Sequence, residues 1–193
     1  MKILKTDIDR AEDSIIRQAI EVMADGGVVL YPTDTVYGLG ANIFNKKAVK
    51  KVFELKERNP TKPLSVLVKD PEDIEVIAKV GAYERESIER HLPGPYTLIL
   101  NRKSIVSRTV TGGLNKVGVR IPDNDISRNL AEIFPITTTS ANLAGLEVDQ
   151  SVDDILSQLN GDVDMVIDVG KLKESNPSTI VDLTTNELIY LER

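Results

Sequence analysis

Short apolar runs alternate with amphipathic segments along this chain, and this alternation limits the folds it can adopt more than any other feature does. Residues 11–24 repeat apolar side chains at helical spacing, and Gly26-Gly27 ends that pattern. The next run, Val28–Tyr31, is short, continuous and partly β-branched, as expected of a buried strand. Pro32 ends this strand because proline has no amide hydrogen to donate, and the polar segment 33–40 predicts a loop.

The rest of the chain continues this alternation. It predicts further helices over residues 46–57, 71–79, 83–92, 125–133 and 151–159, and strands over residues 64–68, 96–100, 117–121, 136–139, 165–169, 179–183 and 188–191. Strands alternate with helices early and crowd together late, which is typical of a mixed parallel and antiparallel sheet with flanking helices. The predicted fold class is therefore α/β. The 193 residues fit one domain, residues 1–193, since domains typically have ~100–200 residues.

The chain has no cysteine and one histidine, His91. The lack of cysteine excludes thiol catalysis, disulfides and cysteine-rich zinc sites. His91 stands at the end of a predicted helix, which favours a dipole-stabilised helix terminus over a general base, because no second histidine or cysteine can form a relay with it. We therefore predict no metal site built by the protein.

Membrane contact is not expected from the sequence. No stretch reaches the ~20 apolar residues of a membrane span. The N-terminus meets charged residues before any long apolar run, so we also expect no signal peptide. Together with the absence of cysteine, these features predict a cytoplasmic protein.

Two familiar nucleotide-binding motifs are absent. Gly38-Leu-Gly40 begins like a dinucleotide fingerprint, but Ile43 stands where a third glycine would let a helix pack closely on a strand. The P-loop motif, Gly-x-x-x-x-Gly-Lys-Ser/Thr, does not occur. The chain thus lacks the usual groups for nucleophilic or redox catalysis. Chemistry that depends on positioning and charge neutralisation, such as phosphoryl or nucleotidyl transfer, remains open.

Positive charge gathers in the segment 46–62, where seven basic and two acidic residues give a net charge of +5 in a chain of net charge −6. We expect Asn45 to cap the helix in this segment, and Pro60 to end it near Arg58. Lys56 and Arg58 would then lie together at the helix end, where a bound anion would relieve their repulsion. Arginine grips phosphate through paired hydrogen bonds and lysine acts as a point charge. The pair predicts a phosphate site, with a solvated helix face as the alternative.

Other polar groups stand in or after predicted strands. Arg120 lies inside the otherwise apolar strand 117–121, and a buried guanidinium without an anionic partner is costly. A substrate carboxylate and an internal Asp or Glu both remain open as that partner. Ser140 and Asn142 follow another predicted strand and form either a ligand site or a capped turn. The loop 33–40 also follows a strand, and open α/β sheets bind ligands at such strand ends.

Five short motifs occur together in order along the chain. They are Tyr-Pro-Thr-Asp-Thr-Val-Tyr-Gly-Leu-Gly from Tyr31, Lys-x-Arg from Lys56 with Lys-Pro-Leu after it, Gly-Val-Arg-Ile-Pro from Gly118, Thr-Ser-Ala-Asn from Thr139, and Pro-Ser-Thr-Ile-Val-Asp from Pro177. In this order they resemble the YrdC family, the L-threonylcarbamoyladenylate synthases. The resemblance spans roughly residues 12–183, and the combination of Lys-x-Arg with Ser-x-Asn is its specific part.

The resemblance implies a fold and a reaction. The fold would be a twisted mixed sheet with helices and a concave, positively charged face. The enzyme, a nucleotidyltransferase, would condense L-threonine, bicarbonate or CO₂, and ATP with Mg²⁺ into threonylcarbamoyl-AMP and release pyrophosphate. A separate complex would then transfer the threonylcarbamoyl group to an adenosine of tRNA. The resemblance leaves open whether this chain itself contacts tRNA or double-stranded RNA.

The resemblance also implies roles for individual residues. Those that would contact ATP are Lys56, Arg58, Asn59, Ser140 and Asn142, and the first two would be catalytic because they hold its phosphates. Those that would line the site for threonine or its carbamate are Thr33, Thr35, Arg120, Thr138 and Ser178. Arg120 would pair with the threonine carboxylate, which agrees with the cost of burying its charge alone.

Two positions depart from the family pattern. Asn59 follows Arg58 directly, where many members have proline, and Pro60 comes one residue later. Ala144 stands where many members have serine. We therefore expect the loop after Arg58 to leave at a different angle, and one hydrogen bond to the nucleotide to be missing.

Two alternatives to this function remain. The chain could carbamoyl-adenylate another substrate, as the similar domain of hydrogenase maturation proteins does, because Lys62-Pro63-Leu64 looks somewhat like that domain. It could also be an RNA-binding module that uses the basic segment 46–62 without catalysis. Such binding would weaken steeply with salt and need no ATP.

Overall fold

A ten-stranded mixed sheet runs through the protein, whose computed structural model describes residues 1–9, 11–173, 176–185 and 189–191. The strands follow the order β1-β8-β2-β3-β7-β4-β6-β5-β9-β10 across the sheet. Their bounds are β1 Lys2–Lys5, β2 Val29–Tyr31, β3 Gly38–Gly40, β4 Ser65–Leu67, β5 Tyr96–Asn101, β6 Lys116–Arg120, β7 Ile136–Ser140, β8 Met165–Asp168, β9 Thr179–Asp182 and β10 Ile189–Leu191.

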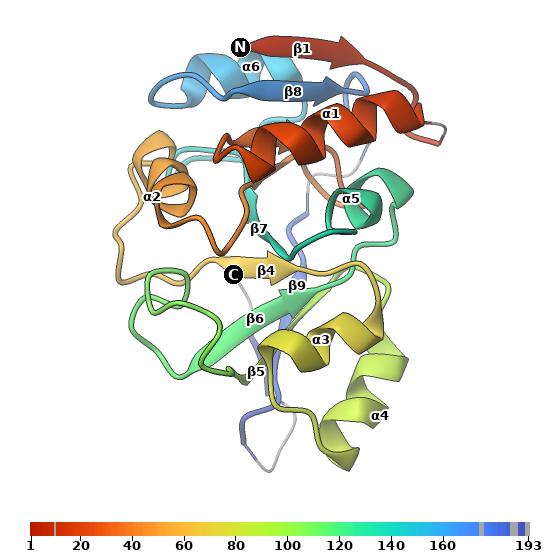
Figure 1. Cartoon of the computed structure of the whole chain (residues 1–193), viewed down its shortest axis with the longest axis vertical. Helices are drawn as coiled ribbons and strands as arrows, with labels where there is room; N and C mark the ends of the chain where they lie inside the picture. Colours follow the sequence, from red (N-terminus) through yellow and green to blue (C-terminus); the bar gives the residue numbers. More distant parts are fainter. Residues whose placement is uncertain (10, 174–175, 186–188, 192–193) are drawn as a thin grey trace.

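Neighbouring strands of this sheet run in both directions. β8 is parallel to β1 and β2, β4 is parallel to β6, and β5 is parallel to β9. The pairs β2·β3, β3·β7, β4·β7, β5·β6 and β9·β10 are antiparallel. Figure 1 shows the strand direction turning from the nearly horizontal β1 and β8 at the top to the oblique β6 lower down, so the sheet is strongly twisted. The twisted mixed sheet with flanking helices is confirmed.

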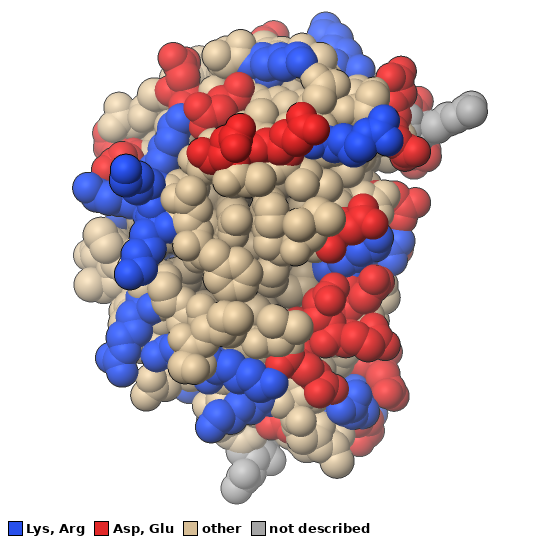
Figure 2. All heavy atoms as spheres, viewed as in Figure 1, with Lys and Arg blue, Asp and Glu red and all other residues tan. Residues whose placement is uncertain are grey.

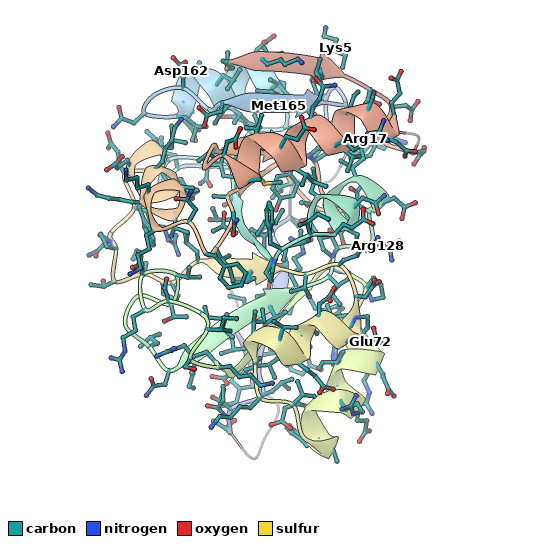
Figure 3. The ribbon with its side chains drawn as sticks, viewed as in Figure 1. Lys5, Arg17, Glu72, Arg128, Asp162 and Met165 are labelled. Atoms are coloured by element: carbon teal, nitrogen blue, oxygen red, sulfur yellow. The ribbon has the colours of Figure 1, made fainter. Side chains whose placement is uncertain are left out.

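The helices pack in two groups, one for each core of the protein. Successive side chains from Val28, just before β2, to Tyr31 enter different cores, since Val28 and Leu30 belong to one and Val29 and Tyr31 to the other. The larger core includes side chains of α2 Lys46–Leu55, α3 Pro71–Ile77, α4 Ala82–His91 and α6 Val152–Gln158, and the smaller core includes those of α1 Asp13–Ala24 and α5 Asp125–Leu130. Figure 3 marks Met165, on β8 beside α1, as one member of the smaller core.

Several predicted element ends need correction. The segment 33–40, predicted as a loop, ends in strand β3, and residues 2–5, for which no element was predicted, form β1. α2 ends at Leu55 instead of continuing to residue 57, because Glu57 has a left-handed backbone with φ of 47°. The predicted start of the last strand, Leu188, lies outside the described residues.

Other local predictions hold. The side chain of Asn45 accepts hydrogen bonds from the amides of Lys47 and Ala48, so it caps α2 as expected. His91 is the last residue of α4 and is buried, and its Nδ1 lies 2.8 Å from the carbonyl oxygen of Ser87 in the preceding turn. This contact agrees with a structural histidine at a helix end.

Charged side chains are unevenly distributed over the face shown in Figure 2. Lys and Arg gather along its left edge, over the lysine-rich helix α2, whereas Asp and Glu dominate the right edge beside α4 and α5. The concave basic face implied by the resemblance stays a prediction. In the described part of the chain, no helix has both the length and the apolar character that crossing a membrane requires.

Candidate functional site

A cleft of about 650 Å³ opens over the middle of the sheet. Its floor is formed by β4, β6, β5 and β7, and its rim by the segment after α2. The residues that line it are Arg58, Lys62, Pro63, Leu64, Ser65, Thr97, Ile99, Leu114, Lys116, Gly118, Thr138, Thr139, Ser140, Ile180 and Asp182. These residues include three cations, one carboxylate, Asp182, and several apolar side chains. Such a lining suits a ligand that has both apolar and anionic parts.

A second cavity of about 20 Å³, enough for a water molecule, adjoins the cleft. It is lined by Thr33, Val36, Tyr37, Gly38, Thr97, Arg120, Thr138, Thr139, Ser140, Pro177 and Ser178. Thr97, Thr138, Thr139 and Ser140 line both spaces. The two cavities therefore form one site, with a wide part near Arg58 and a narrow part near Arg120.

Two strands bring these residues together. β7 lies between β3 and β4, and it places Thr138, Thr139 and Ser140 on the wall that both cavities share. β5 contributes Thr97, whose hydroxyl lies 2.8 Å from the hydroxyl of Ser178. Because these strands come from distant parts of the sequence, the site exists only in the folded sheet.

Gly118 keeps the floor of the cleft open. A Cβ atom at this position would lie 3.0 Å from Oγ of Ser65 and 3.2 Å from Cγ2 of Thr97. Both contacts are tighter than most Cβ contacts, and a larger side chain would also enter the cleft. Glycine therefore lets the β6 backbone form part of the binding surface itself.

The Lys56 side chain points into the protein, whereas the sequence predicted that it would lie beside Arg58 around a bound anion. Its side chain is 1% exposed, and its ammonium donates to the carbonyl oxygens of Ser140 and Asn142 and to Oδ1 of Asn142. The amide of Ala144 in turn donates to the carbonyl oxygen of Lys56. Lys56 thus joins the end of α2 to the turn after β7, and it lines neither cavity.

Arg58 lies at the rim of the cleft, separated from Lys56 by the left-handed Glu57. Its Nη2 donates to the carbonyl oxygen of Pro63 at 2.9 Å, and its Nε donates to that of Lys62 at 3.4 Å. Burial lowers the pKa of Arg58 from its ordinary value, although arginine stays charged at neutral pH. These bonds hold the guanidinium against the loop and leave Nη1 without an acceptor among the described residues.

Ser140 and Asn142 form a tight turn at the end of β7. The Ser140 hydroxyl donates to Oδ1 of Asn142 at 2.6 Å, and the Asn142 amide donates to the carbonyl oxygens of Leu143 and Leu146. The Ser140 hydroxyl and the Asn142 amide therefore both donate within the turn. Ser140 lines the cleft and keeps a lone pair for a ligand, whereas Asn142 is buried behind it and lines neither cavity.

Arg120 is buried and paired. Its Nη2 donates to Oδ1 of Asp34 and to Oγ1 of Thr35, and the side chains of Arg120 and Asp34 are 6% and 10% exposed. The internal-acid interpretation of Arg120 is thus confirmed, and the ligand interpretation stays a prediction. Burial lowers the pKa of Arg120, while the charge of Asp34 raises it. In the described structure its Nε is a buried donor that lacks any hydrogen-bond partner.

The hydroxyls of Thr33 and Thr35 are used within their own loop. Oγ1 of Thr33 donates to the carbonyl oxygen of Val36 at 2.7 Å and accepts from the amides of Thr35 and Val36. Because a hydroxyl has one hydrogen, the 3.1 Å contact between the two threonines requires Thr35 to donate to Thr33. Thr35 then accepts from Arg120. Hydrogen bonds therefore run in one direction, from Arg120 through Thr35 and Thr33 to Val36.

The structure brings together some of the residues assigned from the resemblance. Those that line the joined cavities are Arg58, Ser140, Thr33, Arg120, Thr138 and Ser178. Those that line neither are Lys56, Asn142, Thr35 and Asn59. Asn59 is exposed, and its Oδ1 accepts from the amide and the hydroxyl of Thr61. The direct contacts of these four with ATP or threonine stay predictions.

The sequence interpretation missed Thr97, Lys116 and Asp182 as site residues. Lys116 pairs with Asp182 at 3.0 Å across the wall of the cleft. Hydrogen bonds from Thr184 and this lysine outweigh burial and hold the pKa of Asp182 below its ordinary value. Thr97 and Lys116 belong to strands whose polar positions look like ordinary solvent-facing ones, so only the sheet order could assign them to the site.

Among the described residues, no group of three or more His, Cys, Asp and Glu side chains could hold a metal ion. The one carboxylate that lines the cleft there, Asp182, is already paired with Lys116. A cation at this site would therefore need ligands from a bound anion, with Ser140 as a neutral oxygen donor beside it.

The chain is similar to known proteins over most of its length. The model of the Sua5/YciO/YrdC family, described as "Telomere recombination", matches residues 21–193. A protein of Methanocaldococcus jannaschii named putative threonylcarbamoyl-AMP synthase is 44% identical over 167 residues, which are 86% of this chain and 79% of that protein.

Two solved structures share the fold. Pyrococcus abyssi Sua5, solved in complex with L-threonine, is 36% identical with a TM-score of 0.92 over 99% of this chain. The chain covers 57% of that longer protein. Escherichia coli YciO is 27% identical with a TM-score of 0.89, and the match covers 99% of this chain and 95% of YciO.

Proposed function

Because the chain belongs to the Sua5/YciO/YrdC family, we propose that it makes threonylcarbamoyl-AMP from L-threonine, bicarbonate or CO₂, and ATP. Relatives that it matches over 86–95% of its length carry the name threonylcarbamoyl-AMP synthase. The reaction is the first step in forming N6-threonylcarbamoyladenosine in tRNA. A separate transfer complex, and not this chain, would hand the group to tRNA.

The division of the site into a wide and a narrow part carries this proposal. The wide part has room for a nucleotide, apolar surface for its base, and Arg58, Lys62 and Lys116 for its charge. The narrow part is polar and is lined by Arg120, whose buried Nε lacks a partner among the described residues, and a guanidinium is a suitable donor for a carboxylate. An amino acid beside ATP would then meet the nucleotide at the shared wall formed by Thr138, Thr139 and Ser140.

The reaction can be written with all bonds balanced. The amine of threonine adds to CO₂ and loses a proton, which gives a carbamate. A carbamate oxygen then forms a bond to the α-phosphorus of ATP, while the bond from that phosphorus to the pyrophosphate oxygen breaks. Arg58 and Lys62, at the rim of the cleft, would stabilise the negative charge that develops on pyrophosphate. The role of Lys56 would be to hold the turn at Ser140 and Asn142 in place.

Mg²⁺ would enter with ATP, and the donors of the site fit a metal carried by phosphates. Such a metal keeps its phosphate and water ligands and needs few from the protein. Ser140 would hold it, because it lines the cleft and its hydroxyl oxygen, which donates to Asn142, can still accept. The ion would neutralise phosphate charge, and Ser140 would fix where that charge lies.

The test is pyrophosphate release from ATP and Mg²⁺, with bicarbonate and L-threonine supplied or withheld separately. We expect release only when both are present, and an adenylate with the mass of threonylcarbamoyl-AMP. Parallel reactions with L-serine, L-valine, L-alanine and carbamoyl phosphate test the choice of substrate. Release that is indifferent to threonine, or that carbamoyl phosphate supports better, would contradict the proposal.

A further inference from the structure

We propose that Asp34 is a positioning residue that holds the Arg120 guanidinium at the wall of the narrow cavity, where it can donate to a substrate carboxylate. The inference rests on the proposed function in one respect, namely that the substrate carries a carboxylate. Asp34 lines neither cavity, so it would act only through Arg120.

Asp34 connects three parts of the chain that meet behind the site. It belongs to the loop after β2, its Oδ1 accepts from Arg120 at the end of β6, and its Oδ2 accepts from the amide of Asp123 at 3.1 Å. Both oxygens therefore face donors. A carboxylate satisfies both, whereas an asparagine has one oxygen and one NH₂ group, so it would turn a donor toward a donor.

The neighbouring hydroxyls strengthen this hold on Arg120. Nη2 of Arg120 also donates to Thr35, at 2.7 Å, and the chain of donors continues to Thr33 and the Val36 carbonyl. This fixed direction means that Thr35 can only accept from Arg120. Asp34 and Thr35 together restrain one end of the guanidinium, and a rotation of the guanidinium would break both bonds.

The unpartnered Nε of Arg120 indicates what this restraint serves. A buried N–H without an acceptor costs about 1–3 kcal/mol, and all other buried side-chain nitrogen and oxygen atoms of the described residues have partners. A ligand carboxylate in the narrow cavity would accept from this donor. Because Asp34 and Thr35 already hold the guanidinium in place, binding would cost little further side-chain entropy. A preorganised donor of this kind distinguishes a carboxylate from a neutral amide.

The experiment measures binding of L-threonine and of L-threoninamide by calorimetry to the wild type, Asp34→Asn and Asp34→Ala. Threoninamide lacks the carboxylate and otherwise preserves the side chain. We expect Asp34→Asn to weaken threonine binding at least tenfold and to reduce the preference for threonine over threoninamide. The KM for ATP, measured by pyrophosphate release, should change less than twofold, which a general loss of structure would not allow.

The matched control is Asp125→Asn, which removes an ion pair with Arg128 on α5. Asp125 is 77% exposed, and Figure 3 shows Arg128 at the edge of the molecule, so this change should leave both affinities unaltered. Asp34→Glu, which keeps both acceptor oxygens, should recover part of the threonine affinity. Thermal unfolding of each variant shows whether it is folded.

Unchanged or tighter threonine binding by folded Asp34→Asn would overturn the inference, because Asp34 would then be neutral or a competitor for Arg120. The same holds if wild-type protein binds threonine no better than threoninamide. These binding results do not depend on catalysis. A wild type that binds threonine but releases no pyrophosphate would contradict the proposed function alone.

Discussion

Lys56 and Arg58 stand two residues apart, yet the structure gives them different surroundings. The sequence indicated a pair of cations around one anion. In the fold, three oxygen atoms of Ser140 and Asn142 surround the Lys56 ammonium, whereas Arg58 borders the cleft. Spacing along a helix end does not reveal which side chain turns inward, because that depends on a turn that is more than 80 residues away in sequence.

Replacing Lys56 with methionine should destabilise the fold more than it affects the chemistry. Methionine fills most of the same space but removes the Lys56 donor from the carbonyl oxygens of Ser140 and Asn142. Each unsatisfied group costs ~1–3 kcal/mol, so we expect a loss of about 3 kcal/mol in the free energy of unfolding. Chemical denaturation measures this loss.

The control is Lys50→Met on the same helix, where the lysine is 76% exposed and pairs with Glu54. Its effect should stay below about 0.5 kcal/mol. If Lys56→Met is as stable as the wild type and instead loses ATP affinity, then Lys56 binds phosphate directly, as its place in the sequence motif implies.

Arg58→Ala should slow the reaction while leaving stability nearly unchanged. If Arg58 stabilises the charge that develops on pyrophosphate, its loss costs on the order of 2–4 kcal/mol in the transition state, or roughly 30- to 1000-fold in kcat/KM. Initial rates of pyrophosphate release measure the effect. Arg17→Ala, which removes an exposed arginine of α1 (Figure 3), serves as the comparison. A near-wild-type kcat/KM for Arg58→Ala would refute this role.

At the scale of elements, α2 shows how well local signals predict a helix start and how poorly they predict its end. Asn45 caps α2 as the sequence indicates. The other end was expected near Arg58 because of Pro60, but the backbone leaves the helix earlier, at Glu57. The amide of Arg58 donates to the carbonyl oxygen of Phe53, which closes the helix after Leu55.

Asn45→Ala should therefore weaken α2 without changing the site. The side chain accepts from the amides of Lys47 and Ala48, and losing such a cap costs ~1 kcal/mol. In a protein of this size that corresponds to a melting temperature lower by about 2–4 °C. Asn45→Ser, which keeps an acceptor, should retain most of the stability. A clear change in the KM for ATP would show that α2 instead positions the cleft directly.

Strand β3 was missed because its local signals are those of a loop. Its three residues include Gly38 and Gly40, and glycine is depleted in strands. The fold needs glycine at these positions because the ring of Tyr31 on β2 covers them. A Cβ atom at Gly40 would lie 2.9 Å from that ring. The two glycines are therefore required by a cross-strand contact, which cannot be inferred from residues 33–40 alone.

Strand β1 and the wall of the cleft also depend on pairings between strands far apart in sequence, which local patterns do not reveal. β1 pairs with β8 in parallel, so its partner lies about 160 residues later. The mixed sheet and most helices follow from periodicity, and the motif residues mark the general location of the site. What periodicity cannot supply is the order of strands, and that order decides that Thr97 and Lys116 face the same cleft as Arg58.

At the scale of the whole molecule, stability should fall in acid. Burial alone would raise the pKa of Asp164, but hydrogen bonds from Lys51 and the amide of Val28 outweigh it and lower that pKa. A carboxylate with a depressed pKa stabilises the fold above its unfolded pKa, about 3.9 for Asp. That stabilisation disappears as the pH falls through the folded value.

Melting temperatures between pH 6 and pH 3 measure this dependence. The wild type should lose stability below about pH 4, and Asp164→Asn should lose less over the same interval because it has no charge to titrate there. Asp182 has a lowered pKa for a similar reason, so Asp164→Asn should keep part of the slope. Identical slopes in the two proteins would show that Asp164 does not contribute.

The pairing of β8 with both β1 and β2 has a consequence for synthesis on the ribosome. β2 is complete at Tyr31, but the strand that covers its outer edge begins at Met165. At ~5–20 residues per second, that neighbour emerges on the order of 10 s later. During this interval the nascent chain exposes an apolar strand edge, which favours pairing with other chains. Release before residue 168 should therefore yield a product that aggregates, and a chaperone that shields β2 would raise the yield of folded protein.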